Sequence, residues 1–392
     1  MSNEFLIGHW SFSICHFMRK HIHHHIKKVH HHVKRLKEKK HTVEIILIIF
    51  SLVFSTWLMF HTFGYKDGSM TIGGKAWSDF ANHIPLIRSF SFGWNFPVQE
   101  PLFAGEPIHY HFIFYLLAGL LERIGFRIDW ALNIPSILGF ATLLTIIYLF
   151  AKKVFESKTV GILSVLFFLF NGSLSFIDFF IKHPLGIHTF TDIVTNRTFS
   201  SFGPYDKGIV SAFWNLNIYT NQRHLAPAYA LSLFIIGAFL FHSFTKRKPH
   251  HIFIISIGII FGLSFFFHMA AFMITGVVLA GFFLLYKDLR KPIIYTFMIA
   301  ALFAIPEYLY LKTGSPGGGF AISFVPGYLI YGNLTLINFF HYWFANLGLH
   351  SVLMFIGVYK APMHIRKIFF AIFPVFIIGN LLQFSPEMAA NH

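Results

Sequence analysis

The chain has 392 residues, of which 55% are hydrophobic and 12% are charged, and this balance excludes a soluble globular protein. Its 53 Phe, 15 Tyr and 7 Trp also exclude a disordered or collagen-like chain, and the single cysteine excludes an internal disulfide. The formal charge of +15 would suggest nucleic acid in a soluble protein. In a membrane protein, basic residues beside apolar spans fix the orientation instead. The sequence therefore predicts an integral membrane protein with no nucleic-acid partner.

Residues 1–42 form a basic, histidine-rich segment before the first apolar run. Apolar residues recur in it at steps of three or four from Met18 to Leu36, which is the spacing of one helix face. Such a helix lies on an anionic membrane surface, where each Lys or Arg adds about 1 kcal/mol of attraction. We expect a cytoplasmic interfacial arm, followed by a transmembrane domain over residues 43–392.

Seven apolar runs have about the 17 to 25 residues that a bilayer-spanning helix needs. They cover residues 43–61, 131–151, 159–178, 225–244, 293–311, 341–359 and 367–384. Another run, 252–286, is too long for one pass, so we expect a hairpin that turns near residues 268–270. The pattern predicts an all-α, polytopic membrane helical bundle of about nine spans.

The segment 108–125 decides the orientation, because its apolar core covers only residues 112–121. If the segment does not cross, most Lys and Arg residues fall on the side of the N-terminus, as the positive-inside rule requires. We therefore expect a juxtamembrane or re-entrant helix here, and a plasma-membrane protein whose N-terminus is cytoplasmic. Three outer loops follow, at 63–130, 179–224 and 312–340. Glycines within residues 314–319 of the third suit either a lid or a plain connector.

The first outer loop carries the most informative residues. Asp79 and His83 are four positions apart, so on a helix they share a face and can converge on one hydroxyl or one metal ion. A carboxylate there suits a general base toward an acceptor hydroxyl. The alternative is a solvated acid at a helix start. Another stripe, with Phe80 and Ile87, suits the lipid surface.

Several features in order resemble the C-type glycosyltransferase superfamily (GT-C). They are an acidic residue soon after the first span, the stretch PLFAGEPIHYHFIFYLLAGLLERIG, and a span ending in YLFAKKVF. The PLFAGEPIHYHF portion is similar to bacterial and archaeal membrane proteins named for a Tyr-Tyr-Tyr motif. Here that triplet is replaced by His109, Tyr110 and His111. The resemblance implies a GT-C-like fold with a helical first outer loop.

The resemblance implies an enzyme that transfers a sugar from a polyprenyl-phosphate donor to a lipid, glycan or protein acceptor on the outer face. It also implies that Asp79 is the catalytic or acceptor-binding acid. Departure of a lipid phosphate is favoured by cations. Arg223 and His224, at the mouth of a span, and Arg88 are the candidates. For Arg223 the alternative is an interaction with lipid headgroups.

Further candidates for substrate binding share only an outer position or an apolar setting. They are His83, Glu100, Glu106, His109, Tyr110, His268 and Glu307. For His268 the alternative is a hydrogen bond to a neighbouring helix, and Glu307 is costly inside a span unless it is paired. The outer acids and His83 suit Mg²⁺ or Mn²⁺, but scattered acids do not establish a metal site. Some members of the superfamily need a divalent ion and others do not.

Two rivals to the enzyme stay open. A transporter or lipid-linked glycan flippase needs charged or broken helices at the bilayer midplane, whereas these spans are nearly free of charge there. A non-catalytic assembly scaffold would leave the outer acids without a role. The chain also ends just after its last span, which suggests a truncated product. The donor sugar and the acceptor cannot be read from the sequence.

Overall fold

The structure is a computed structural model that describes most of the chain after the basic arm. It describes residues 41–73, 77–103, 105–195, 209–211, 213–245, 249–313, 323–327, 330 and 333–383, without the side chains of Trp77, Ser78, Asp178 and Gln383. The chain divides into two compact units, residues 1–50 and 51–392. The predicted interfacial helix and the glycines at 314–319 lie outside the described residues.

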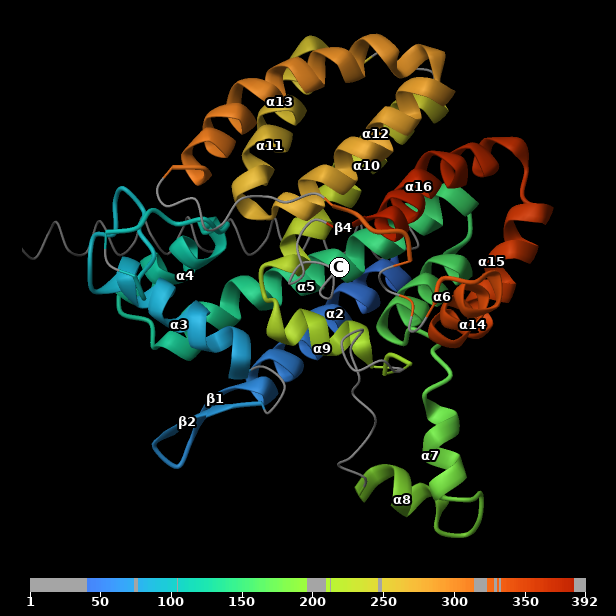
Figure 1. Cartoon of the computed structure of the whole chain (residues 1–392), viewed down its shortest axis with the longest axis horizontal. Helices are drawn as coiled ribbons and strands as arrows, with labels where there is room; N and C mark the ends of the chain where they lie inside the picture. Colours follow the sequence, from blue (N-terminus) through green and yellow to red (C-terminus); the bar gives the residue numbers. More distant parts are fainter. Residues whose placement is uncertain are drawn as a thin grey trace, which may run out of the picture. The chain divides into compact units, whose positions relative to one another are not determined.

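The described residues are mostly helical (Figure 1). The helices are α2 (Thr42–Thr62), α3 (Trp77–Ser91), α4 (Ile113–Arg123), α5 (Ile128–Phe155), α6 (Lys158–Leu169), α7 (Phe176–Lys182), α8 (Thr189–Thr195), α9 (Trp214–Asn221), α10 (Leu225–Thr245), α11 (His251–Phe267), α12 (Met269–Leu285), α13 (Arg290–Leu311), α14 (Leu336–Leu347), α15 (Leu349–Lys360) and α16 (Met363–Leu381). A 3₁₀ turn, Lys287–Leu289, precedes α13. Two short antiparallel pairs join β1 (Phe63–Lys66) to β2 (Ser69–Ile72) and β3 (Ser323–Phe324) to β4 (Leu382–Gln383). The chain is thus an all-α membrane protein with minor strands.

Five helices of the described residues are long and apolar enough to cross a membrane. They are α2, α5, α10, α13 with its preceding 3₁₀ turn, and α16. Each coincides with one of the predicted runs to within a few residues. These five predictions of long apolar helices are confirmed, and the total of nine spans stays a prediction.

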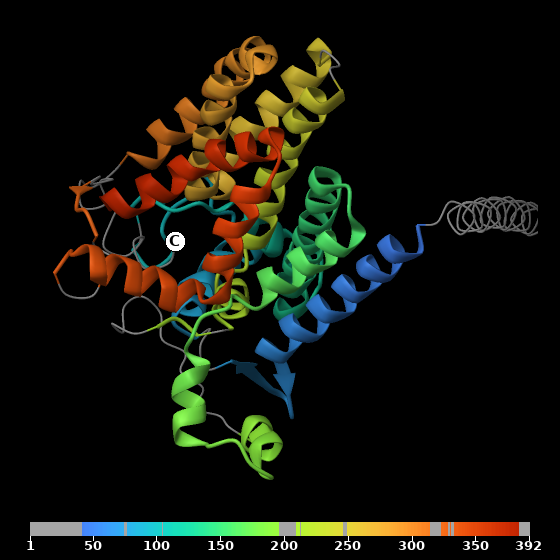
Figure 2. The same cartoon turned by 90° about the vertical axis from the view of Figure 1, so that its right-hand side faces the viewer.

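The other predicted spans take different forms. The run at 159–178 is helical in α6 only as far as Leu169. The run at 341–359 falls on α14 and α15, which are bent by 98° at Gly348 and pass the span test only as a pair. Figure 2 shows these two orange-red helices meeting at nearly a right angle. The apolar run therefore predicted helical structure here, but it did not predict the bend at Gly348.

The hairpin predicted at 252–286 is present as α11 and α12, each of 17 residues. The helix breaks at His268, which has an extended backbone conformation and whose side chain accepts a hydrogen bond from the amide of Ala271. This is an N-cap, which satisfies one of the amides that the first turn of a helix leaves without a partner. The predicted turn near residues 268–270 is confirmed.

Helices α3 and α4 lie side by side and bury a shared apolar core (Figure 1). Phe80 and Ile87 of α3 are buried in this core, so the expectation that their stripe faces lipid is wrong. The pattern of an apolar helix face was correct, but α4 covers it instead of the bilayer. With only 11 residues, α4 is about 16 Å long and too short to cross a membrane.

Gly119 allows α4 to approach α3 this closely. A Cβ at this position would lie 2.6 Å from the Cβ of Phe90 and 2.8 Å from the carbonyl oxygen of Ile87. Both contacts are shorter than van der Waals packing allows, and the second is to backbone that cannot rotate away. The position of α4, and of the residues that precede it, therefore depends on the absence of a side chain at Gly119.

We predict that Gly119→Ala lowers the free energy of unfolding by about 1–3 kcal/mol, the usual cost of overpacking. Gly357→Ala is the matched control, because nothing lies within 4 Å of a Cβ placed there in α15. That control should leave stability unchanged or raise it, since alanine favours a helix over glycine. Denaturation followed by circular dichroism in detergent measures both, and equal effects of the two changes would contradict the close contact.

Candidate functional site

Several element ends meet at a buried polar cluster. They are the C-terminal end of α2, the N-terminal ends of α5 and α10, the break between α11 and α12, and the adjacent faces of α3 and α4. Because consecutive membrane helices alternate in direction, these ends lie at one side of the bundle. The cluster therefore stands where the apolar helices end and not at their middle.

Arg223, between α9 and α10, is completely buried. Its guanidinium donates to Oδ1 of Asn133 (2.7 Å), to Oγ1 of Thr62 (2.9 Å) and to backbone carbonyls of Met59 and Thr220. Each of these acceptors is neutral. Burial lowers the pKa of Arg223 to about 9, so the side chain still carries its charge at neutral pH.

Tyr115 of α4 connects two buried histidines. Its hydroxyl lies 2.7 Å from Nε2 of His83 and 2.7 Å from Nδ1 of His224. The other ring nitrogen of His83, Nδ1, is buried without a hydrogen-bond partner among the described residues. A buried acceptor without a partner is less costly than a buried N–H without one, so we assign the proton of His83 to Nε2, which donates to Tyr115.

Asp79 joins the same cluster through Gln222. The amide of Gln222 donates to Oδ2 of Asp79 at 2.7 Å, and its carbonyl oxygen lies 3.5 Å from the hydroxyl of Tyr110. The ring of Tyr110 in turn stacks near that of Tyr115, with centroids 6.2 Å apart. A chain of polar groups therefore runs from the carboxylate of Asp79 to the imidazole of His224.

Three further ring contacts bring histidines from distant parts of the chain together. His111, His224 and His268 each offer a ring nitrogen, and these three atoms lie within 4.8 Å of one another. The ring centroids are 4.2 Å apart for His111 and His224, 4.7 Å for His111 and His268, and 5.1 Å for His224 and His268. His224 and His268 are buried. We call these three residues the histidine cluster.

Burial determines the charges around the cluster. It lowers the pKa of His83 to about 3, with a further contribution from the positive charge of Arg223, so His83 is neutral at physiological pH. Burial also raises the pKa of Asp79, and the hydrogen bond from Gln222 opposes this rise. Burial raises the pKa of both Tyr110 and Tyr115, so these phenols stay protonated. The site is thus a set of neutral donors and acceptors with one buried cation and one partly buried acid.

Five of the predicted site residues lie in or beside this cluster, namely Asp79, His83, Tyr110, His224 and His268. Arg223 belongs to the same polar cluster, but the four hydrogen bonds described above direct its guanidinium toward protein oxygens. This arrangement makes Arg223 a structural cation at the centre of the helix ends.

The remaining predicted residues have other partners. Nε of Arg88, at the far end of α3, lies 3.1 Å from a carboxylate oxygen of Glu122. Glu100 and Glu106 belong to a tight loop in which the amide of Glu100 donates to the carbonyl of Glu106. Nδ1 of His109 lies 2.7 Å from the carbonyl oxygen of Leu311, and Glu307 accepts a hydrogen bond from the amide of Phe266. The acids proposed as Mg²⁺ or Mn²⁺ ligands are therefore not gathered at one point.

Sequence reasoning missed several members of the site. Tyr115, Gln222 and Asn133 were not singled out, and His111 was noted only within the replaced triplet. Tyr115 contacts His83 and His224, which are 32 and 109 residues away, so it too had no local signal. The contacts of Gln222 and Asn133 span 143 and 90 residues of sequence, and no local pattern reports such pairings.

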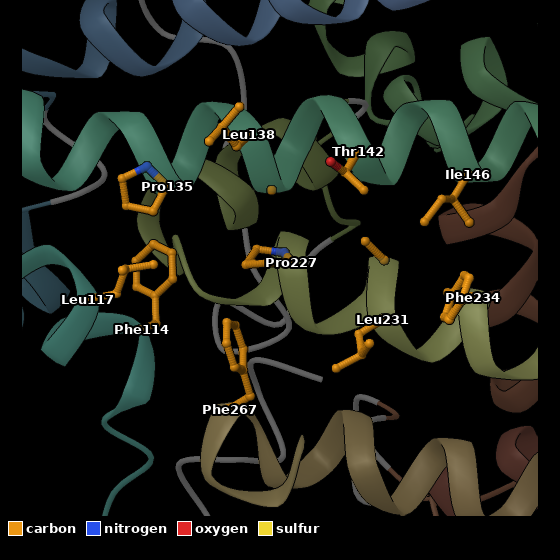
Figure 3. Close-up of a pocket in the computed structure, with 12 residues that line it drawn as sticks. Phe114, Leu117, Pro135, Leu138, Thr142, Ile146, Pro227, Leu231, Phe234 and Phe267 are labelled. Atoms are coloured by element: carbon orange, nitrogen blue, oxygen red, sulfur yellow. The ribbon is translucent and has the colours of Figure 1, made fainter. Parts of the chain in front are cut away.

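An apolar groove runs between α5 and α10 (Figure 3). It reaches the histidine cluster at Phe114, whose ring centroid lies 6.3 Å from that of His224. Its volume is about 440 Å³, and its lining includes Pro135 to Ile146 on α5 and Pro227 to Phe234 on α10. Phe114 and Phe267 close one end, next in sequence to Tyr115 and His268. Along α5 the groove extends for about 16 Å at 1.5 Å per residue. Leu138, one of the lining residues, is 56% exposed, so the groove is open at the surface of the bundle.

Comparison with models of protein families, with curated protein sequences and with solved structures finds no match for this chain.

The neutral, buried state of His83 predicts a loss of stability in acid. Between the folded-state pKa of about 3 and the ordinary value of 6.5, the unfolded chain binds a proton that the folded chain excludes. The contribution of His83 to stability is therefore present above pH 6.5 and falls by about 1.4 kcal/mol for each pH unit below it.

We predict that the unfolding temperature falls between pH 7 and pH 5 and that His83→Gln makes this slope smaller. The exposed His364 provides the control, because His364→Gln should leave the slope as it is in the wild type. Differential scanning fluorimetry over this range measures the three slopes. Parallel curves for the wild type and His83→Gln would show that His83 is not kept neutral by the fold.

Proposed function

We propose that this protein is a membrane glycosyltransferase that takes a sugar from a polyprenyl-phosphate donor and transfers it to a lipid, glycan or protein acceptor. In this proposal the N-terminus is cytoplasmic, the protein resides in the plasma membrane, and the polar cluster stands at the outer surface. The observation that carries the proposal is the apolar groove that ends at buried polar groups. A ligand that fits both parts has an apolar chain and a polar head.

The dimensions of the groove support a lipid-linked donor. Its length of about 16 Å is close to half of the roughly 30 Å hydrocarbon thickness of a bilayer. A lipid chain that lies in one leaflet can therefore enter along α5 and α10 with its head at the level of His224. The lining is almost wholly apolar, with Thr142 as its one hydroxyl-bearing member. A water-soluble donor would gain little from such a surface.

Asp79 is the proposed general base toward the acceptor hydroxyl. Its carboxylate is only partly buried, so an acceptor can approach it, and Gln222 fixes the orientation of one oxygen. Burial raises the pKa of Asp79, which makes its carboxylate a stronger base while it remains ionised above that pKa. Transfer should therefore require deprotonated Asp79 and should decline as the pH falls through its pKa.

We predict that Asp79→Asn lowers the rate of sugar transfer by about 10²-fold or more, the usual contribution of a positioned general base. Asparagine keeps the shape and can still accept the hydrogen bond from Gln222, so folding should be preserved. The measurement is transfer of radiolabelled sugar from a lipid-linked donor by purified protein in nanodiscs. Asp192→Asn, at a partly buried acid in α8 that lies outside the cluster, is the control. Unchanged transfer by Asp79→Asn would remove Asp79 from the mechanism.

Filling the groove should weaken donor use without touching the polar cluster. We predict that Thr142→Trp raises the KM for a lipid-linked donor at least about tenfold, because the indole occupies the space of the lipid chain. The matched control is Leu149→Trp, at a position of α5 that is 46% exposed and does not line the groove. Equal KM values for the two variants would place the donor elsewhere.

An experiment in cells can identify the donor sugar. Mass spectrometry of lipid-linked sugars and glycans with and without the gene should show one lipid-linked sugar that accumulates and one glycosylated product that disappears. A lipid-linked glycan that changes leaflet without any new glycosidic bond would support a flippase instead. No change in either pool would leave the scaffold as the better account.

A further inference from the structure

His268 presents a hydrogen-bond donor to the histidine cluster. Its Nδ1 accepts the amide proton of Ala271 at 3.1 Å in the N-cap of α12. A neutral imidazole carries one proton, and because Nδ1 is the acceptor that proton is on Nε2. His268 therefore offers an N–H and not a lone pair at its other nitrogen.

This tautomer is unfavourable for a metal ligand. A histidine that binds a metal ion through one nitrogen donates the proton of its other nitrogen to a second group. At His268 the second nitrogen already accepts a proton, so metal binding would break the cap of α12. Two of the rings, His224 and His268, are also stacked at 23°, whereas ligands of a common ion direct their ring edges toward it.

The electric field at the cluster favours an anion. His224 directly precedes α10, which has 21 residues, and His268 caps α12, which has 17. The N-terminal ends of both helices carry partial positive charge at the cluster, and the C-terminal end of α11, at the same break, carries partial negative charge. Arg223 adds a full positive charge next in sequence to His224, and its four acceptors are neutral. A divalent cation would be repelled by this full charge.

We propose that His111, His224 and His268 bind a phosphate-class oxyanion and not a transition-metal ion. The Nε2–H of His268 donates to one anion oxygen, and His111 and His224 act as further donors once the anion stabilises their protonated forms. The adjoining groove makes an oxyanion on an apolar chain the best-fitting ligand. This inference names the headgroup site of the proposed lipid-linked donor, but it concerns binding only and needs no sugar transfer.

Other titratable and charged groups surround the cluster. They are Asp79 and His83 on α3, Tyr110 before α4, Tyr115 on α4, Arg223 before α10 and Glu307 on α13. Tyr115 and His83 are neutral by the shifts described above, and Glu307 is engaged by the amide of Phe266. Asp79 and Glu307 are the acids among these groups, and Asp79 reaches the cluster through Gln222 and the stacked rings of Tyr110 and Tyr115.

Binding to the full-length protein in phosphatidylcholine nanodiscs tests the proposal with defined probes. Farnesyl phosphate carries both parts of the ligand, farnesol only the chain, and inorganic phosphate only the anion. By isothermal titration, farnesyl phosphate should bind at least about tenfold more tightly than farnesol, since a hydrogen bond to a charged group contributes that much. Competition by inorganic phosphate would indicate that the site also binds the free anion. A lack of competition would indicate that binding needs the lipid chain. Both support the oxyanion.

The decisive variant is His268→Asn. Asparagine is a good N-cap, so its side-chain oxygen can still accept the amide of Ala271 while the donor to the cluster is lost. Affinity for farnesyl phosphate should fall about tenfold and affinity for farnesol should not change. His364→Asn, at an exposed histidine of α16, is the control. His111→Gln should also lower the affinity for farnesyl phosphate, which keeps the proposal testable if His268→Asn does not fold.

Two results would overturn the proposal. The first is binding that does not depend on the phosphate or on the histidines. In that case farnesyl phosphate and farnesol bind equally, or folded variants bind farnesyl phosphate like the wild type. The other is one zinc ion per chain that is lost in His268→Asn and competes with farnesyl phosphate. The difference between variants is needed because the histidine-rich arm offers further imidazole groups to zinc. Either result leaves the sugar-transfer assay to be judged separately, since that assay reports a glycosidic product and this one reports binding.

Discussion

A guanidinium buried among apolar helices is costly unless every donor finds an acceptor, and the position of Arg223 follows from how that requirement is met. Two of its acceptors are the carbonyls of Met59 and Thr220, which lie in the last turns of α2 and α9. Carbonyls at a helix C-terminus lack helical partners and carry partial negative charge. Arg223 therefore donates hydrogen bonds to the C-terminal carbonyls of two helices, and these carbonyls stabilise its charge. A shift of either helix end would leave part of the guanidinium without an acceptor.

The rest of the site is arranged around this fixed cation. Asn133 binds Arg223 with its carbonyl oxygen and donates its amide to the carbonyl of Phe63 at 2.9 Å, so the start of α5 is held to the end of α2. His224 follows Arg223 directly and is held by Tyr115, which positions α4 against the start of α10. The groove between α5 and α10 begins at this same junction, where a Cβ on Gly139 would lie 2.6 Å from Cδ of Pro227. One buried charge thus fixes both the polar cluster and the mouth of the groove.

The sequence predicted those parts of the fold that depend on local pattern. Apolar runs located the five long helices, and the polar residue in an otherwise apolar run located the turn at His268. The spacing of Asp79 and His83 placed both on one helix, and the structure links both to the same cluster. Periodicity could not distinguish a helix face that packs on lipid from one that packs on protein, which is why Phe80 was assigned to the wrong environment.

The role of Arg223 shows what local pattern cannot supply. An arginine at the mouth of a span suits phosphate or lipid headgroups, and both interpretations assume that the side chain points outward. Its actual acceptors include two backbone carbonyls 164 and 3 residues away and a threonine 161 residues away. Backbone acceptors have no signature in the sequence, because every residue has one. The same argument applies to His268, whose proton is assigned by a backbone amide and not by another side chain.

Charge balance connects these observations to the chemistry proposed for the site. Arg223 is a full positive charge with four neutral acceptors, whereas Asp79, which the chain of polar groups reaches, is only partly buried. Burial keeps His83 neutral, and the positive charge of Arg223 contributes. A negative headgroup would complete the balance, and its arrival would favour protonation of nearby imidazoles at the moment when a departing phosphate needs donors. The acid would then lie at the Gln222 end of the chain of polar groups and the anion at the histidine cluster, so that the base toward one substrate and the donors to the other are different residues.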